Sequence, residues 1–251
     1  MNDILEKIVA GLRGLGVEPG DTLLVHSSLS SLGWVDGGAE TVIKALIVAL
    51  PEGTLLMPAL DWRYVNKEHP YFSVRETPSN VGVIPETFRK YPGVIRSLHP
   101  LHSVCAYGVN AAEITSSHYL DRTPVGENSP FRLLMKYSGK ILMLGCGLRP
   151  MTFMHGVEEA AGLPYVLEDE PTKISVEDYD GKVEEVFHRL HYFRGYGQRY
   201  ERVADCMEIA RGKVLDADAY LLDALTLWNS AGKKVREVPF YFVDEISGDE
   251  E

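Results

Sequence analysis

The residues Thr152, His155 and Glu158 lie at intervals of three, where a helix is expected to follow the turn LGCGLRP. Side chains three positions apart on a helix lie on neighbouring turns, so the imidazole of His155 and the carboxylate of Glu158 can meet. A carboxylate raises the basicity of an imidazole and fixes its tautomer, as a general base requires. The same spacing is also typical of a surface helix pair, so it predicts a base only together with other evidence.

A second candidate is the loop HSSLSSLGWVDGG at 26–38, between an expected strand and an expected helix. The hydroxyls of Ser27, Ser28 and Ser30, together with backbone N–H groups near the start of the helix, could receive phosphate oxygens. The loop is neither GxGxxG nor GxxxxGK[ST], and its composition is equally typical of turn and cap chemistry. Phosphate binding and a plain turn therefore both stay open from the residues alone.

A third polar cluster, in the segment RSLHPLHS, contains Arg96, Ser97, His99 and His102. These side chains could line a cleft. Pro100 fixes the backbone beside His99, so a rigid connector with hydrogen-bonded histidines is the alternative interpretation.

Metal and nucleophile motifs are not found in the sequence. No HExxH occurs, no Cys/His cluster has the spacing of a zinc site, and no GxSxG marks a serine hydrolase. His188 and His191 are three apart, but the expected strand end around them offers no companion carboxylate nearby. The cysteines Cys105, Cys146 and Cys206 form no CxxC pair and are interpreted as structural thiols. We therefore expect no metal.

The composition of the chain limits the classes of molecule that it is expected to bind. The chain has 251 residues and a net charge of −11, which disfavours nucleic acid and would attract a cationic substrate. The first residues are typical of an amphipathic helix rather than a signal peptide, and no apolar run reaches the roughly 20 residues of a membrane span. We expect a cytoplasmic protein, and the sequence says nothing of its oligomeric state.

The elements that must position these residues form a mixed α/β pattern. An opening helix precedes a β-α-β unit within the first 60 residues, and an irregular loop follows up to Pro78. Ser79 is expected to cap the next helix. No repeat or linker is found, so one layered domain over residues 1–251 is expected. The other expected elements are strands at 103–108 and 140–145, helices at 111–116, 131–137, 151–162 and 217–231, and a hairpin turning at Asp180-Gly181.

Five segments in order resemble the aminoglycoside 3-N-acetyltransferase family, also called the antibiotic N-acetyltransferase superfamily. They are VHSSLSSLGWVDGG, TPSNVGVIPETFRKYPGVIRSLHPLHS, GENSPFRLL, LGCGLRPMTFMHGVEEAAGLPY and RGKVLDADAYLLDA, with the weakest agreement between about 171 and 205. The resemblance implies an α/β/α layered domain with a mixed central sheet, distinct from the common GNAT acetyltransferase fold. It also implies acetyl-CoA as the acetyl donor, an aminoglycoside as the acceptor and no metal.

The resemblance also implies roles for single residues. His155 corresponds to the catalytic histidine, which would deprotonate the acceptor amine, and Glu158 to its associated acidic residue. Coenzyme A would be received by Ser27, Ser28 and Ser30, with Arg96, Ser97 and Ser103 near its pantetheine or phosphate end. The resemblance assigns no residue to the cationic acceptor, and the candidates chosen for their residue type are Asp61, Tyr64, Glu159 and Asp205.

Two other functions stay open. An acyltransferase acting on another amino sugar or on a nucleotide-linked amine would share the same chemistry, and the basic and aromatic segment 188–203 departs from an acidic acceptor site. A coenzyme A-binding protein without turnover is the alternative from a different class, although such a protein has no need of a base.

Overall fold

The computed structural model describes residues 3–193 and 195–246, which form a mixed sheet between two layers of helices. The central sheet has seven strands in the order β10-β11-β6-β1-β2-β5-β4. β1 pairs in parallel with β2 on one side and with β6 on the other, and the outer pairs are antiparallel. The strands are β1 (Thr22–Ser27), β2 (Thr54–Pro58), β4 (Ile95–Arg96), β5 (Val104–Gly108), β6 (Lys140–Leu144), β10 (Ala210–Val214) and β11 (Ala217–Asp223).

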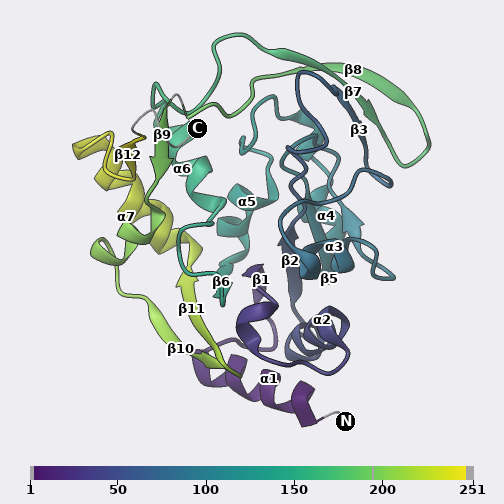
Figure 1. The fold of residues 1–251 in the computed structure, drawn as a ribbon, viewed down its shortest axis with the longest axis vertical. Coiled ribbons are helices and arrows are strands. Elements are labelled where there is room, and N and C mark those ends of the chain that lie inside the picture. The colour runs from purple at the N-terminus through teal and green to yellow at the C-terminus, as the bar shows by residue number, and fades with distance from the viewer. Residues whose placement is uncertain (1–2, 194, 247–251) are drawn as a thin grey trace.

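Alternate side chains of the central strands enter two separate cores. On β1, Leu23 and Val25 point into the first core and Leu24 into the second, as the two-residue period of a strand requires. Helices α1 (Asp3–Leu15), α2 (Gly38–Ala49) and α3 (Val83–Arg89) cover the first face. Helices α4 (Ala111–Thr115), α5 (Pro130–Leu133), α6 (Phe153–Ala160) and α7 (Ala224–Glu237) cover the second. The α/β/α prediction is confirmed (Figure 1).

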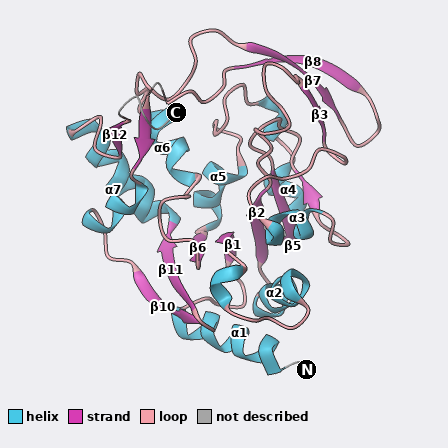
Figure 2. Cartoon of the chain, viewed as in Figure 1, coloured by secondary structure: helices cyan, strands magenta, loops and turns pink. Residues whose placement is uncertain are grey.

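Two small sheets lie outside the central one. β3 (Tyr71–Ser73), β7 (Thr172–Glu177) and β8 (Val183–His188) form a three-stranded sheet with its own apolar cluster around Phe72 and Ile174. β9 (Tyr196–Gln198) pairs with β12 (Val243–Glu245). Short 3-10 helices are η1 (Ser30–Leu32), η2 (His118–Leu120), η3 (Leu134–Tyr137) and η4 (Tyr200–Asp205). Figure 2 shows long loops joining the central sheet to the three-stranded one.

Three expectations about local structure are wrong. The segment expected to be irregular up to Pro78 contains β3, because Tyr71–Ser73 pairs in parallel with β7. Ser79 does not cap a helix, because α3 begins later, after Gly82, and the Ser79 backbone N–H donates to Glu86 Oε2 at 2.8 Å. The helix expected over 217–231 is strand β11 followed by α7. Burial alternates along most of β11, and Asp223 then caps α7 by accepting a hydrogen bond from the Thr226 N–H at 2.7 Å. The β-α-β unit and the hairpin at Asp180-Gly181 are confirmed.

Within 3–193 and 195–246, no helix is both long enough and apolar enough to cross a bilayer. That residues 1–251 form one domain stays a prediction.

Candidate active site

The candidate site lies where the chain changes sides of the sheet. β1 and β6 are parallel neighbours, with Ser27 paired to Leu144, and the Ser28 N–H donates to the Leu144 carbonyl at 2.9 Å. β1 leads into α2 on one face, whereas β6 leads into α6 on the other. Crevices open beyond the carboxyl ends of strands at such switch points. The serine loop and the helix bearing His155 both start at this point.

The predicted base is held by a residue that the sequence did not indicate. Tyr200, at the start of η4, donates its hydroxyl proton to Glu158 Oε2 at 2.6 Å and lies 2.7 Å from His155 Nδ1. Because the tyrosine has one proton and Glu158 receives it, the Tyr200 oxygen accepts from His155 Nδ1–H. This tautomer leaves the lone pair on His155 Nε2, the atom that a general base uses.

Glu158 therefore acts on His155 through Tyr200. The shortest separation of His155 Nδ1 from Glu158 is 3.8 Å, so the two do not share a direct hydrogen bond. Glu158 is fully buried, and its second oxygen accepts from the Tyr165 hydroxyl at 2.9 Å. Burial and the Glu158 carboxylate raise the pKa of Tyr200 well above its ordinary value, so the phenol keeps its proton.

The serine loop separates two cavities that share Ser27. Ser28 Oγ lies 3.2 Å from Ser30 Oγ, so these two hydroxyls lie side by side. The Ser27 hydroxyl is buried and has no partner among the described residues. A cavity of about 650 Å³ is lined by Ser27, Ser28, Leu29, Ser30, Gly33, Trp34, Val35, Gly37, Gly38, Gly82, Val83 and Ile84. A second, of about 410 Å³, is lined by His26, Ser27, Pro58, Leu60, Trp62, Val81, Pro85, Cys146, Arg149, Pro150, Thr152, His155, Gln198 and Tyr200.

A glycine fixes the end of this loop at the start of α2. Gly37 has φ +75°, a left-handed conformation, and a Cβ there would collide with Thr41 Oγ1. The chain can therefore turn into α2 and leave the helix's first N–H groups beside the larger cavity, whose lining includes Gly37 and Gly38.

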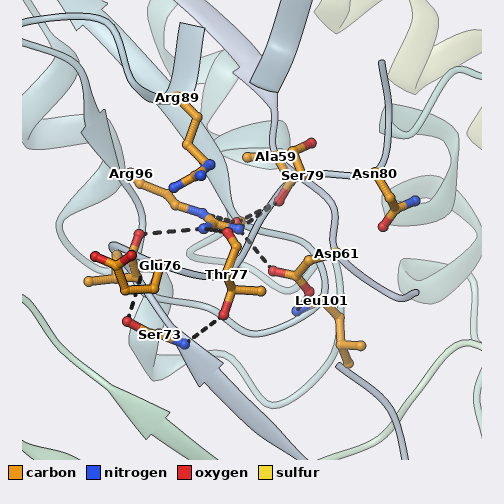
Figure 3. A network of polar contacts seen from close by, with 12 residues as sticks. Ala59, Asp61, Ser73, Glu76, Thr77, Ser79, Asn80, Arg89, Arg96 and Leu101 are labelled. Atoms are coloured by element: carbon orange, nitrogen blue, oxygen red, sulfur yellow. Dashed lines mark hydrogen bonds and ion pairs between the residues drawn. The ribbon is translucent and has the colours of Figure 1, made fainter. Parts of the chain in front are cut away.

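Arg96 and Asp61 lie side by side (Figure 3). Neither they nor Ser103, which is hydrogen-bonded to Arg96, are among the residues that line the two cavities. Arg96 Nη2 pairs with Asp61 Oδ2 at 2.9 Å, and Arg96 Nε donates to Ser103 Oγ at 2.8 Å. The guanidinium also donates to the carbonyls of Thr77 and Ala59. Arg96 is 2% exposed and Asp61 0%. Burial raises the pKa of Asp61 and lowers that of Arg96, and their attraction opposes both shifts. The network joins three chain segments internally.

Ser97 is likewise used inside the protein. Its hydroxyl lies 2.8 Å from His118 Nδ1 and accepts from the Val104 N–H at 2.9 Å. His118 stacks on His99 with ring centroids 4.3 Å apart, and His188 meets His99 edge-on. This part of the polar segment is a buried connector, whereas His102 points elsewhere.

A second histidine cluster surrounds the candidate base. His102, His155 and His191 each offer a ring nitrogen, and these three atoms lie within 4.8 Å of one another. His191 Nε2 lies 2.7 Å from Glu159 Oε1, so the expectation that His191 has no companion carboxylate is wrong. Sequence reasoning missed this cluster, because its members lie 36 or more positions apart along the chain and no local motif joins them.

The four acceptor candidates do not line the cavity that holds His155. Asp61 is paired with Arg96, and Glu159 is paired with His191. Tyr64 is 47% exposed, and Asp205 lies at the surface, accepting from the Tyr241 hydroxyl at 3.0 Å. Asp61 and Tyr64 meet only through the backbone, where the Tyr64 N–H donates to the Asp61 carbonyl at 2.7 Å, so the described residues do not form a shared acidic acceptor site from these four.

The cavity around His155 has a neutral-to-basic lining. None of its described lining residues is Asp or Glu, and Arg149 contributes a positive charge. Cys146 also lines it, but burial raises the pKa of this thiol to about 11, so it stays protonated at neutral pH. A histidine base, rather than a cysteine nucleophile, is the reactive group that this cavity offers.

Comparisons with known proteins agree on one family. The family model for aminoglycoside 3-N-acetyltransferase matches residues 24–236. An aminoglycoside N(3)-acetyltransferase IX from Micromonospora chalcea is 33% identical over 257 aligned positions, covering 90% of each chain.

Solved structures show the same similarity. A structure of AAC-IIIb with CoASH superposes with a TM-score of 0.80 at 25% identity, covering 93% of this chain and 96% of that one. A histidine-to-alanine mutant of the aminoglycoside acetyltransferase AAC(3)-IVa, in complex with a gentamicin, superposes with a TM-score of 0.81 at 29% identity, covering 94% and 90%.

Proposed function

The chain belongs to the aminoglycoside 3-N-acetyltransferase family, and from this premise we propose that it transfers the acetyl group of acetyl-CoA to the 3-amino group of an aminoglycoside. It is an acyltransferase whose co-substrate is acetyl-CoA. One observation carries the assignment of the site: His155, held by Tyr200 and Glu158, lines a cavity that meets a second cavity at Ser27.

His155 acts as the base. An acceptor amine is mostly protonated at neutral pH and cannot attack a thioester until it loses a proton. His155 Nε2 carries the free lone pair and takes this proton, because Tyr200 fixes Nδ1–H. The positive charge that develops on the imidazole is stabilised by the buried Glu158 carboxylate, whose nearer oxygen lies 3.8 Å from Nδ1.

The serine loop receives coenzyme A. A buried hydroxyl without a hydrogen-bond partner destabilises the protein, and a ligand that supplies the hydrogen bond removes this cost. The Ser27 hydroxyl is such a group, and it lies where the two cavities meet. Ser28 and Ser30 line the larger cavity next to the N-terminus of α2, where backbone N–H groups favour phosphate. The donor then lies in the larger cavity and the amine in the smaller, with the reacting atoms meeting near Ser27.

Arg96, Ser97 and Ser103 support the site without contacting coenzyme A. Their polar groups are hydrogen-bonded inside the protein, and all three side chains are buried. We assign them the role of holding the segment that leads to His102 against β2 and β5, rather than contacting the pantetheine or phosphate. Asp61 shares this role through its ion pair with Arg96.

The lining of the smaller cavity favours a second candidate function. A polycationic aminoglycoside needs carboxylates nearby, yet the described lining contains none and includes Arg149. An amine that carries a neutral or anionic group, such as a nucleotide-linked amino sugar, fits this lining better. Tyr64 and Asp205 stay the exposed candidates for contacting a cationic acceptor outside the cavity.

The proposal is tested by acceptor-dependent release of the coenzyme A thiol. Wild type, His155→Ala and the control His69→Ala, whose histidine is exposed and outside the site, are assayed with acetyl-CoA and two panels. One panel holds gentamicin, kanamycin, neomycin and apramycin, and the other holds amino sugars and nucleotide-linked amines. Release with an aminoglycoside that is lost only in His155→Ala supports the proposal.

Two other results of this assay would contradict the proposed acceptor or the proposed turnover. Release only with the second panel would support the second candidate. Coenzyme A binding without release for any amine would favour a binding protein without turnover.

A further inference from the structure

We propose that His102, His155 and His191 form a binding site for a divalent transition-metal ion of the Zn²⁺ type, and that the bound ion blocks the base. The bound ion takes no part in the acetyl-transfer reaction, although one of its ligands, His155, is the proposed base. Its inhibitory consequence rests on the proposed role of His155, whereas metal binding itself does not.

The three side chains supply a suitable set of ligand atoms. One ring nitrogen from each lies within 4.8 Å of the other two. Zinc binds imidazole nitrogen at about 2.0–2.1 Å in a tetrahedron, which places neighbouring ligand atoms about 3.3 Å apart. The cluster therefore has to contract by about 1.5 Å or less, which rotation of the imidazole side chains can supply. Imidazole ligands favour Zn²⁺, Cu²⁺ and Ni²⁺ over Mg²⁺ and Ca²⁺.

Burial favours the neutral form of two of the three imidazoles. A metal binds neutral imidazole and must otherwise displace a proton. Burial, reinforced by repulsion from neighbouring imidazoles, lowers the pKa of both His102 and His191 well below 6.5. This direction is compatible with metal binding, and the site itself is inferred from the positions of the three ring nitrogens.

Neighbouring groups already orient the rings. His191 Nε2 contacts the Glu159 carboxylate at 2.7 Å, which favours a proton on Nε2 and a lone pair on Nδ1. His155 Nδ1 is held by Tyr200, leaving Nε2. Histidine ligands in metal sites use such contacts to carboxylates to fix their tautomer. His102 Nδ1 is buried and has no partner among the described residues, which a metal ion would provide.

Charge and access also fit. The buried Glu158 and the partly buried Glu159 lie within reach of the cluster and offset part of a double positive charge. His155 lines the cavity of about 410 Å³, so an ion can enter from that side, and a water molecule can complete a tetrahedron there. The metal would use the Nε2 lone pair of His155, so the acceptor amine could not be deprotonated.

Direct metal titration of the full chain tests the site without any substrate. Chelator-treated protein is titrated with Co²⁺, whose visible spectrum reports tetrahedral nitrogen coordination, and with Zn²⁺ in competition with a chromogenic chelator. We expect one equivalent bound by wild type and by the control His69→Gln. His102→Gln should bind at least tenfold more weakly, and Glu159→Gln about 10- to 100-fold more weakly through His191.

Several outcomes would overturn the site: no saturable binding, an octahedral Co²⁺ spectrum, or equal affinity in wild type and His102→Gln. Circular dichroism and coenzyme A binding check the fold of each variant. If His102→Gln does not fold, His155→Asn, at a partly exposed position, removes a different ligand.

Inhibition is measured separately, as acetylated product by mass spectrometry, because the released thiol itself binds zinc. We expect Zn²⁺ to inhibit wild type and a chelator to restore activity. His102→Gln should need an at least tenfold higher Zn²⁺ concentration for the same inhibition. Unimpaired turnover at saturating Zn²⁺ would overturn the blocking role. If no acceptor is acetylated but wild type binds one Zn²⁺ through these residues, the proposed function fails and the metal site stands.

Discussion

Replacing Tyr200 by phenylalanine removes one oxygen atom from the centre of the site. That oxygen donates to Glu158 Oε2 at 2.6 Å and lies 2.7 Å from His155 Nδ1, so His155 loses its orienting partner and its link to the carboxylate. A hydrogen bond to a charged group contributes about 1.5–3 kcal/mol. At 1.36 kcal/mol per factor of ten, kcat should fall roughly 10- to 150-fold.

The matched control is Tyr165→Phe, which removes the other hydrogen bond to Glu158, at 2.9 Å, without touching His155. If Tyr200 acts by positioning the base, Tyr200→Phe lowers kcat with little change in KM, and Tyr165→Phe lowers it much less. Acetyl transfer is followed at saturating acetyl-CoA, with thermal unfolding and coenzyme A affinity as checks of the fold. A Tyr200→Phe enzyme with kcat within twofold of wild type, or equal losses in both variants, would refute the relay from Glu158 through Tyr200 to His155.

Three further predictions concern the base, the buried ion pair and acid stability. His155→Ala should raise the activation free energy by about 3 to 5 kcal/mol, and near wild-type kcat would remove His155 as the base. Asp61→Asn leaves the Arg96 charge buried without its counter-ion, so urea unfolding should show a loss of about 3 to 5 kcal/mol; an unchanged midpoint would contradict the role of the ion pair. Burial lowers the pKa of His118 to about 3 and that of His188 to about 4, so the unfolded chain binds more protons below pH 6.5. Stability should therefore be full above pH 6.5 and fall towards pH 3, and His118→Asn should flatten this dependence in urea titrations.

The sequence predicted those parts of the fold whose pattern is local. Strand β1, helix α2 and strand β2 follow from β-branched runs and helical spacing, and the hairpin follows from Asp180-Gly181. β11 was missed because its residues, ADAYLLD, also match helical spacing, and pairing with β6 and β10 decides the conformation. Ser79 failed as a cap because Gly82, with φ +119°, delays the start of α3.

In the site, too, contacts between residues close in sequence were predictable and contacts between distant residues were not. His155 and Glu158 are three apart on one helix, so their proximity was predictable, although not that Tyr200 lies between them. Tyr200 is 45 residues from His155 and belongs to the segment in which the resemblance is weakest. The buried state of Arg96 could not be predicted either, because an arginine is usually exposed unless a partner such as Asp61, 35 positions away, compensates its charge.

The arrangement of the site separates the reaction from the choice of acceptor. The base and the serine loop follow β6 and β1, two paired central strands whose register leaves little freedom, so the geometry of acetyl transfer is set by the core of the sheet. Tyr200 and His191 come from the segment after β8, where short elements replace central strands. A change in that segment can therefore alter the lining of the cavity through Gln198 and the metal affinity through His191, while the serine loop and His155 stay in place. From this segment Tyr200 hydrogen-bonds to the base, which makes it a position where a change in acceptor specificity and a loss of rate should coincide.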